Sequence, residues 1–496
     1  MSNNSLTYFP KYFSNKAILG YCIAMAIIGI VFFNRAMPLY LWLFGFTSVI
    51  LFFAGSNSLS KKWAKDSSKV FEKKVFWAAF LIRLAYVIFI FYFNNGRYGH
   101  YYESNIGDIG FYVPTAWQAA QIATGGLPFA NETLSQTYLE TSIWDIPKMW
   151  LSWNIGFSDI GYMFYLTMVY ILTGGISDVI IPLIIKSAIG AYTCILLYRI
   201  GKNHFGDSIG KMTAIFCLLQ FNLIWWCGSM MKETEMIFIS SLFIYRMDRV
   251  LNGQKINPLY IAVTIFFGLI IFTFRSALGM VAFAATIAAL TFATKRQLST
   301  GKKILAGIFI VGGMAIAMGD TIKEEINGVV EIAQDSSYQQ TNMNWRTGRA
   351  HGNEFAKYAG AAVFAPLIFT IPFPTMSYTW LDQEMLMQAH GGNFEKNILS
   401  FFVILAMFSF LRRRNWREHL LPIAYTLGYL LALVLSVFAQ SGRFHMPIIP
   451  FEMMFAAYGV SLMNNRNKHW FNFVVVIEVI ACIGWQWFKL KGQGLI

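Results

Sequence analysis

Long apolar runs separated by short polar segments are the main pattern of this 496-residue sequence. A helix that spans a bilayer needs about 20 predominantly apolar residues. Thirteen stretches approach that length and predict thirteen membrane-spanning helices, at 17–34, 37–54, 75–93, 178–198, 212–229, 236–252, 258–274, 278–294, 304–320, 397–411, 420–439, 447–463 and 470–488. No small-residue cleavage site follows the polar residues 1–16, so the first run is expected to be a retained helix. The predicted fold is all-α and polytopic, with a single transmembrane domain over residues 1–496.

Lysines and arginines cluster in alternate loops between these runs. The clusters are Lys61, Lys62, Lys65, Lys69, Lys73 and Lys74; Arg199, Lys202 and Lys211; Arg246, Arg249 and Lys255; Lys295, Arg296, Lys302 and Lys303; Arg412, Arg413, Arg414 and Arg417; and Arg466 and Lys468. A single alternation puts all of them on one side, which the positive-inside rule makes cytoplasmic. The sequence therefore predicts a cytoplasmic N-terminus and location in the cytoplasmic (inner) membrane of the cell.

This topology leaves two long segments on the outer side, at residues 94–177 and 321–396. Each contains an apolar stretch that cannot cross the membrane without inverting the later basic loops: Gly161–Leu172 and Ala359–Phe373. We expect these stretches to form helices or hairpins in the outer interface, since irregular backbone is tolerated there when protein covers it or it lines a cavity. The rest of each loop mixes polar and aromatic residues, as expected for a cap over a substrate site.

The composition agrees with a membrane protein. Hydrophobic residues make up 56% and charged residues only 13% of the chain, whereas a soluble domain has about 25% charged residues. The net charge of +14 follows from the basic loops, and no long basic stripe lies outside the membrane, so nucleic acid is not an expected partner but membrane lipids are. The five cysteines have no metal-binding spacing and are expected to be packing residues.

Ionisable residues at the outer edge of the membrane are the candidates for chemistry, because burial near lipid is costly without a function. Asp108 lies in the run Gly107-Asp108-Ile109-Gly110-Phe111-Tyr112, where it can act as a general base. The alternative is that Asp108 caps a helix from Tyr112 to Ala123, and the two roles do not exclude each other.

A second group is Met230-Met231-Lys232-Glu233-Thr234-Glu235, in a tight turn between two predicted spans. Glu233 is a candidate second acid, and Lys232 is a candidate to hold an anionic group. An ordinary solvated turn with a local Lys–Glu pair of little energetic value is the alternative.

A third group opens the span 447–463 from the outer side. Arg443 presents a fork of donors suited to phosphate oxygens, and its position is against the positive-inside trend. Snorkelling of Arg443 to the headgroups is the less favoured alternative. His445 is a proton shuttle or a hydrogen-bonded packing residue, with packing favoured.

Other candidates carry weaker signals. Arg275 lies at the outer end of the span 258–274. The second outer segment holds a basic and aromatic cluster of Trp345, Arg346, Arg349 and His351. Glu103, Asp145 and Asp159 are additional outer carboxylates, and Lys186 is expected to contact a lipid phosphate or to snorkel. No P-loop, H-E-x-x-H or G-x-S-x-G motif is present, so an enzyme here needs an activated substrate delivered in the membrane.

The order of these groups resembles the GT-C superfamily of polyprenyl-phosphate-dependent glycosyltransferases, including the protein O-mannosyltransferase type (glycosyltransferase family 39). Those enzymes carry a catalytic Asp in the first outer loop, before an aromatic-rich helix, as do Asp108, Phe111, Tyr112 and Ala116. The family element Tyr-x-x-Gly-(Arg/Lys) before a Phe-Gly is matched by Tyr198, Gly201 and Lys202 with Phe205-Gly206. A second acid and an arginine before a proline-flanked helix are matched by Glu233 and by Arg443, Pro447 and Pro450. The resemblance covers residues 95–255 and 440–462.

The resemblance implies a glycosyltransferase, expected to be inverting, with a polyprenyl-phosphate-linked sugar as donor and a glycan or lipid-linked acceptor. Asp108 would then be the base, and Glu233 would position the acceptor or a metal. Arg443, with Lys232 or Arg275, would hold the donor phosphate. No cofactor is required, because arginine and lysine can hold a monophosphate, but a divalent metal is left open.

Two alternatives remain. A polymerase or ligase of lipid-pyrophosphate-linked polysaccharide repeats would use several arginines of the second outer segment, such as Arg346 and Arg349. A transporter or flippase of lipid-linked sugars would show inverted repeats, charges buried at mid-membrane and discontinuous helices. The sequence shows no repeat, and its candidate charges are expected at the outer edge.

Overall fold

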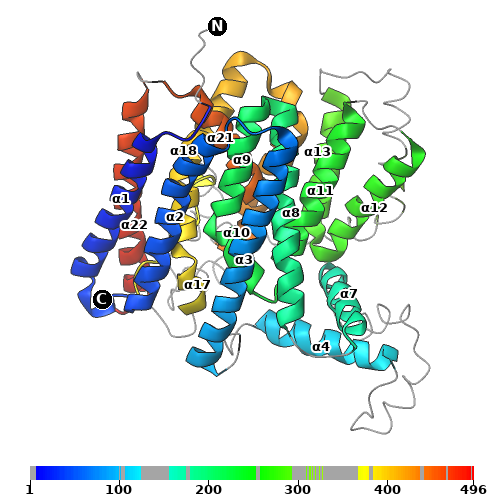
Figure 1. The fold of residues 1–496 in the computed structure, drawn as a ribbon, viewed down its shortest axis with the longest axis horizontal. Coiled ribbons are helices and arrows are strands. Elements are labelled where there is room, and N and C mark those ends of the chain that lie inside the picture. Colours follow the sequence, from blue (N-terminus) through cyan, green and yellow to red (C-terminus); the bar gives the residue numbers. More distant parts are fainter. Residues whose placement is uncertain are drawn as a thin grey trace.

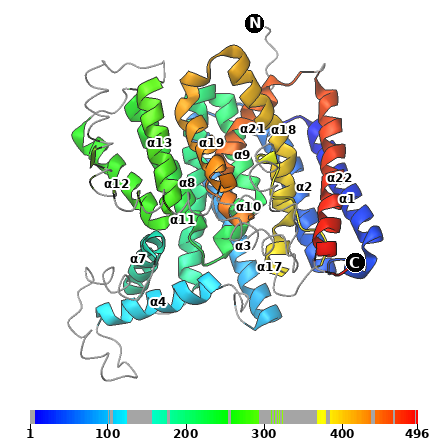
Figure 2. The ribbon, with the colours of Figure 1, turned by 180° about the vertical axis from the view of Figure 1, so that it is seen from behind.

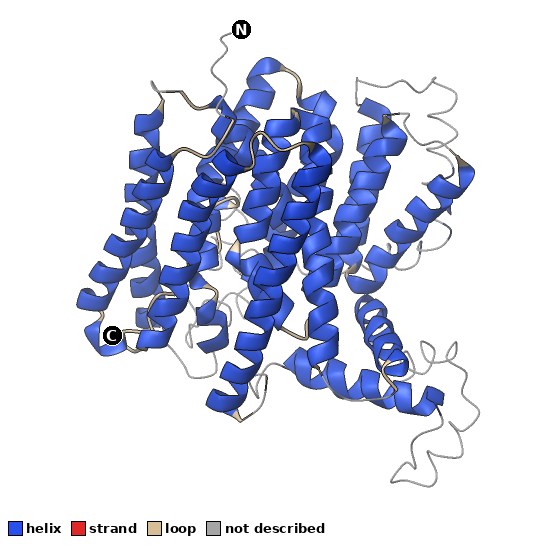
Figure 3. Cartoon of the chain, viewed as in Figure 1, coloured by secondary structure: helices blue, strands red, loops and turns tan. Residues whose placement is uncertain are grey.

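The computed structural model describes residues 7–99, 101, 107–124, 156–174, 179–252, 257–292, 367–378, 384–435, 441–464, 467–492 and 494–496, and seven single positions between 309 and 327. Within these ranges the regular structure is helical and no strand occurs (Figure 3). The all-α prediction is confirmed.

Twelve of the thirteen predicted spans coincide with helices. These helices are α1 (Lys11–Val31), α2 (Leu39–Lys62), α3 (Ser68–Tyr98), α8 (Ile180–Phe205), α9 (Asp207–Leu219) with α10 (Phe221–Trp225), α11 (Glu233–Leu251), α12 (Pro258–Phe274), α13 (Ser276–Phe292), α18 (His390–Arg413), α19 (Leu420–Leu435), α21 (Ile449–Leu462) and α22 (Lys468–Gly492). Seven described helices are long and apolar enough to cross a membrane, or eight if the bent α9–α10 pair is one span. The predicted span 304–320 lies mostly outside the described residues.

The long helices run side by side, and the described basic loops between α2 and α3, between α8 and α9 and between α18 and α19 lie at one end of the bundle (Figure 1). Contacts between these loops hold that end together. Lys211 donates hydrogen bonds to the carbonyl oxygens of Ala64 and Asp66, and Arg199 forms an ion pair with Glu72 at 2.7 Å. The grouping of basic residues at one end agrees with the alternation that the sequence predicts.

The other end carries α4 (Gly107–Thr124), which lies across the bundle, and α7 (Phe157–Leu172), which packs between α4 and α12 (Figures 1 and 2). The short helices α17 (Glu384–Gln388) and α20 (Gly442–His445) are also described. The predicted interfacial stretch Gly161–Leu172 falls within α7, whose 16 residues are fewer than the roughly 20 that a straight span needs.

A break between α9 and α10 bends the chain by 56° inside the bundle. Two buried charged side chains form hydrogen bonds with backbone groups at the helix ends on either side of this break. The Arg83 guanidinium donates to the carbonyl oxygens of Cys217 and Leu218 at the C-terminal end of α9. The Glu395 carboxylate accepts a hydrogen bond from the Phe221 amide, at the start of α10, at 3.0 Å. Each charge has the sign that the adjacent helix end favours.

Side chains of α18 and α22 supply hydrogen-bond partners for the backbone of the non-helical segment 367–378 in the same way. Lys396 donates to the carbonyl oxygens of Phe369 and Ile371, and Gln486 donates to that of Pro374 at 2.8 Å. Buried side chains thus replace the missing backbone partners, as irregular backbone near lipid requires. Arg83, Glu395 and Lys396, which were not among the candidate residues, are buried among the helices.

Candidate active site

Arg443 joins two carboxylates that lie far apart in the sequence. From α20, its Nε donates to Oε1 of Glu233, the first residue of α11, at 2.5 Å. Its Nη1 donates to Oδ2 of Asp108, in the first turn of α4. The three residues that the sequence singled out most strongly therefore meet in one cluster.

Burial differs across this cluster. The side chain of Glu233 is fully buried, that of Arg443 is 21% exposed, and that of Asp108 is 46% exposed. The cluster consequently presents Asp108 to the surroundings and keeps Glu233 inside. A ligand that approaches from the side of α4 meets Asp108 and Arg443 before it meets Glu233.

Arg275, between α12 and α13, is the second guanidinium beside Glu233. Its Nη2 lies 3.5 Å from Glu233 Oε1, and its Nη1 donates to the Tyr429 hydroxyl of α19 at 2.9 Å. The guanidinium also lies over the Phe444 ring, 4.5 Å from the ring centre. Glu233, Asp108, Arg443 and Arg275 together carry no net formal charge, which offsets part of the cost of burying Glu233 and Arg275.

Lys232 belongs to an adjacent cluster with Asp159 of α7. Its Nζ lies 2.5 Å from Asp159 Oδ1 and donates to the Ser158 carbonyl oxygen. The Tyr112 hydroxyl of α4 donates to the same Asp159 oxygen at 2.5 Å. Asp159 thus ties together α4, α7 and the start of α11, the elements that carry Asp108 and Glu233.

Burial affects both partners of Asp159. It lowers the pKa of the Lys232 ammonium below its ordinary value, and the neighbouring Asp159 carboxylate offsets part of this shift. Burial, with the charge of Asp159, raises the pKa of the Tyr112 hydroxyl above its ordinary range. Tyr112 is therefore a neutral hydrogen-bond donor at physiological pH.

The solvated-turn interpretation of residues 230–235 is wrong. Lys232, Glu233 and Glu235 are all buried, and the lysine pairs with Asp159 of another helix. Glu235 instead pairs with Lys186 of α8 at 2.8 Å. The expectation that Lys186 snorkels or contacts lipid is wrong too, since its side chain is fully buried and also donates to the Met231 carbonyl oxygen.

The remaining candidates have mixed outcomes. His445 is fully buried, in keeping with the packing interpretation. Helix α4 begins at Gly107 rather than at Tyr112, so Asp108 lies within the helix and does not precede it as the capping interpretation requires. Arg346 and Arg349, with their neighbours Trp345 and His351, lie outside the described residues.

Sequence reasoning gave little weight to Asp159 and missed Tyr429. Asp159 stands just before the aromatic run Gly161-Tyr162-Met163-Phe164-Tyr165, and an acid at the start of an amphipathic helix was the available signal. Tyr429 lies inside an apolar span, where a tyrosine gives no sequence signal. Its role depends on the position of α19 beside Arg275.

The cluster's chemistry is that of anion binding beside a carboxylate base. Two guanidinium groups offer planar, forked donors suited to phosphate oxygens, and Asp108 is an exposed acceptor next to one of them. Among the described residues no group of three His, Cys, Asp or Glu side chains is placed to hold a metal. Arg443 lies between Asp108 and Glu233, so these two carboxylates would have to release it to share a divalent ion.

Fold and site together define a polytopic, all-helical membrane protein with a charged cluster at the end of the bundle opposite the basic loops.

A scan against protein-family models finds no match, and no curated protein is similar to the chain in sequence. The chain is similar to a solved structure of the archaeal oligosaccharyltransferase AglB from Archaeoglobus fulgidus, in complex with an inhibitory peptide and a dolichol-phosphate, at 11% identity and a TM-score of 0.39. The match covers 86% of this chain and 56% of that chain, so this chain spans little more than half the length of AglB.

Proposed function

We propose that this protein is a membrane glycosyltransferase that moves a sugar from a polyprenyl-phosphate donor to a hydroxyl group of a glycan or lipid-linked acceptor. The observation that carries the proposal is the convergence of Asp108, Glu233 and Arg443 on one cluster. An exposed carboxylate and a guanidinium group suited to binding phosphate then lie side by side, as a transfer from a phosphorylated donor requires.

In the proposed reaction, Asp108 takes the proton of the acceptor hydroxyl while that oxygen attacks the anomeric carbon of the donor sugar. The bond from the anomeric carbon to the phosphate oxygen breaks, and the polyprenyl phosphate leaves with the bonding electrons. Arg443 and Arg275 stabilise the charge on the leaving phosphate. Attack opposite to the departing phosphate inverts the anomeric configuration.

Arg443 has a second part in this proposal, because it engages Asp108 directly. A donor phosphate competes with Asp108 for the Nη1 group of Arg443, and its binding releases the carboxylate for the acceptor. Glu233 keeps the guanidinium in place through Nε during this exchange. The polyprenyl-phosphate donor follows from the family resemblance, and the location on the outer face of the membrane follows from the positive-inside rule. Both belong to the proposal.

The first experiment measures transfer by the purified protein in nanodiscs. Radiolabelled polyprenyl-phosphate sugars are supplied with a crude glycan acceptor extract. The variants are Asp108→Asn and Arg443→Ala, with Asp66→Asn as control, since Asp66 pairs with Lys74 at the basic end. We expect Asp108→Asn to lose roughly 100-fold or more in rate, the usual range for a general base, and Asp66→Asn to retain full activity.

Thermal melts distinguish a lost catalytic group from a lost fold. Full transfer by a folded Asp108→Asn variant would contradict the base assignment and direct attention to Glu233. Absence of transfer from every monophosphate donor, together with chain growth from pyrophosphate-linked repeats, would replace the glycosyltransferase with the polymerase or ligase.

A transporter or flippase is the second candidate, and two structural features favour it. The α9–α10 pair is discontinuous, and charged residues such as Glu395 and Lys396 are buried between helices, as transporter sites often are. Both features have a local structural cause, because these side chains satisfy helix ends and irregular backbone. Movement of a fluorescent polyprenyl-phosphate sugar across proteoliposome membranes, without transfer to any acceptor, would favour this candidate.

A further inference from the structure

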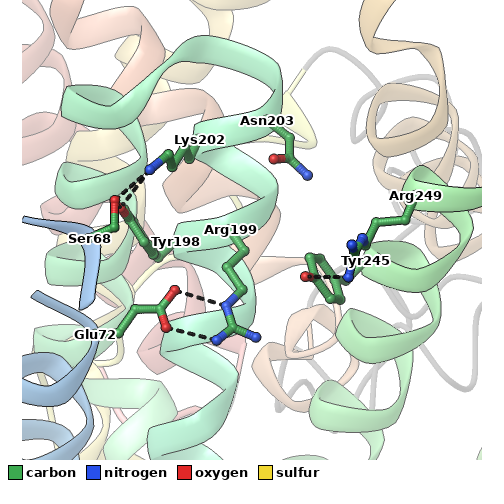
Figure 4. Close-up of a pocket in the computed structure, with 8 residues that line it drawn as sticks. All are labelled: Ser68, Glu72, Tyr198, Arg199, Lys202, Asn203, Tyr245 and Arg249. Carbon is green, nitrogen blue, oxygen red and sulfur yellow. Dashed lines mark hydrogen bonds and ion pairs between the residues drawn. The ribbon is translucent and has the colours of Figure 1, made fainter. Parts of the chain in front are cut away.

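A second charged site lies at the basic end of the bundle, away from the Arg443 cluster. It is a hollow of about 280 Å³ lined by Ser68 and Glu72 of α3, Tyr198, Arg199, Lys202 and Asn203 of α8, and Tyr245 and Arg249 of α11. Figure 4 shows these side chains around the hollow, with Arg199 between Glu72 and Tyr245. None of them belongs to the proposed reaction.

Glu72 fixes the orientation of Arg199. Nε and Nη2 of Arg199 donate to the two carboxylate oxygens of Glu72, at 2.9 and 2.7 Å. This forked pairing uses one edge of the guanidinium and leaves Nη1 directed toward Tyr245 (Figure 4). An arginine held in this way is a preorganised donor for an anionic oxygen. Its guanidinium also lies over the Tyr245 ring, 6.0 Å from the ring centre.

The lining has an excess of positive charge. Arg199, Lys202 and Arg249 are opposed by Glu72 alone among the lining residues. Lys202 also contacts Asp207, which lies 3.0 Å from its Nζ, but Asp207 is shared with Lys211. The hollow therefore favours an anion, which would compete with the Ser68 and Tyr198 hydroxyl groups for the Lys202 ammonium.

A partly exposed aromatic strip leads from this hollow toward the middle of the membrane. Phe76 and Phe80 follow Glu72 at intervals of four residues, on the same face of α3. Their rings stack at 6.2 Å, and Phe80 lies about 12 Å along the helix from Glu72. This gives one side of the strip.

The other side comes from α8 and α11. Tyr192 lies two helical turns from Arg199 on α8, and its ring is 6.1 Å from that of Phe238 on α11. Helix α8 packs against both α3 and α11 and lies between them in Figure 1. Aromatic side chains thus lie along the outer face of α8 and its two neighbours, next to the cationic hollow.

We propose that this hollow binds the phosphate head group of an anionic phospholipid, with the acyl chains along the aromatic strip formed by α3, α8 and α11. A basic pocket between helices at the membrane surface is suited to such head groups, and the apolar strip distinguishes a lipid from a soluble phosphate. The positive-inside rule explains why basic residues are at this end, but not why Arg199 is held by Glu72 at the rim of a hollow.

The test uses native mass spectrometry of the full chain released from nanodiscs. The nanodiscs contain either phosphatidylcholine alone or an equimolar mixture of phosphatidylcholine and phosphatidylglycerol. The variants are Arg199→Gln and Arg199→Lys. Arg413→Gln is the matched control, because Arg413 is exposed at the same end but does not line the hollow.

The native chain is expected to retain phosphatidylglycerol in preference to phosphatidylcholine. Arg199→Gln should weaken that retention roughly tenfold, as loss of a charge-assisted hydrogen bond does. Arg199→Lys should weaken it too, because lysine keeps the charge but not the fork, and Arg413→Gln should change it little. A thermal melt for each variant confirms that the fold is intact.

Equal loss in Arg199→Gln and Arg413→Gln would overturn the proposal, since binding would then depend only on diffuse positive charge. Equal retention of the two lipids would overturn it as well. Displacement of phosphatidylglycerol by millimolar inorganic phosphate would assign the hollow to a soluble phosphate instead of a lipid.

Discussion

At the scale of single residues, the contacts of Arg443 determine the character of the candidate site. Its guanidinium bonds one oxygen of Glu233, which has no exposure of its own, and also meets the exposed Asp108. Removing one member of a buried ion pair leaves the other uncompensated, which costs more than the pair contributes. Arg443 is therefore expected to be important for stability as well as for the proposed reaction.

The substitution Arg443→Met tests this dependence. We expect the free energy of unfolding to fall by about 2–3 kcal/mol. This is less than the roughly 3–5 kcal/mol that breaking a buried pair usually costs, because Arg275 still lies 3.5 Å from Glu233. Adding Glu233→Gln should recover most of the loss, since a neutral amide needs no counter-charge. Thermal melts of the two single variants and the double variant in detergent measure this coupling. Additive losses would show that Glu233 does not depend on Arg443.

At the scale of elements, close helix packing gives some glycines a fixed role. Helices α18 and α21 pack against each other, and both are labelled in Figure 2. A Cβ atom at Gly459 of α21 would lie 2.0 Å from the carbonyl oxygen of Phe402 in α18. Backbone cannot move aside as a flexible side chain can, so the two helices would have to separate.

Gly459→Ala is accordingly expected to lower the free energy of unfolding by about 1–3 kcal/mol, the usual cost of overpacking. Gly484→Ala in α22 is the matched control, because a Cβ atom there has no neighbour within 4 Å. The control should be neutral or slightly stabilising, since alanine favours the helix. Scanning fluorimetry in detergent measures both, and an unchanged melting temperature in Gly459→Ala would contradict the close approach of α18 and α21.

At the scale of the whole molecule, the two ends of the bundle differ in charge and in the sites that they carry. The basic loops and the Glu72–Arg199 hollow lie at one end, and α4 with the Arg443 cluster lies at the other. If the basic end is cytoplasmic, the proposed transfer takes place on the outer face. The direction of the bundle in the membrane therefore decides where the substrates must be delivered.

Single cysteines introduced at exposed positions test this orientation. The background is a variant in which Cys22, the one partly exposed native cysteine, is replaced by serine. We expect Phe111→Cys on α4 to react with an impermeant maleimide in intact cells, because Phe111 is exposed at that end. Arg413→Cys should react only after permeabilisation, and Ile480→Cys, exposed on the lipid-facing side of α22, should react in neither case. Labelling of Arg413→Cys alone in intact cells would invert the orientation.

The sequence by itself determined the helical class and the positions of twelve helices, seven or eight of which are long and apolar enough to cross a membrane. It also singled out Asp108, Glu233 and Arg443, which the structure brings into one cluster. It succeeded because apolar length and loop charge are local properties that lipid imposes on each segment separately. It also placed Asp108, Glu233 and Arg443 near the same side of the membrane, since each lies at a loop on that side.

Only the tertiary structure decided which charged groups meet. The sequence could not pair Lys232 with Asp159 or Lys186 with Glu235, because such pairs depend on which helices lie side by side. It also could not foresee the buried Arg83 and Glu395, which are stable only because the broken α9–α10 pair presents helix ends to them. Long-range packing sets the partners of a charge, and those partners decide whether it is solvated, structural or available for chemistry.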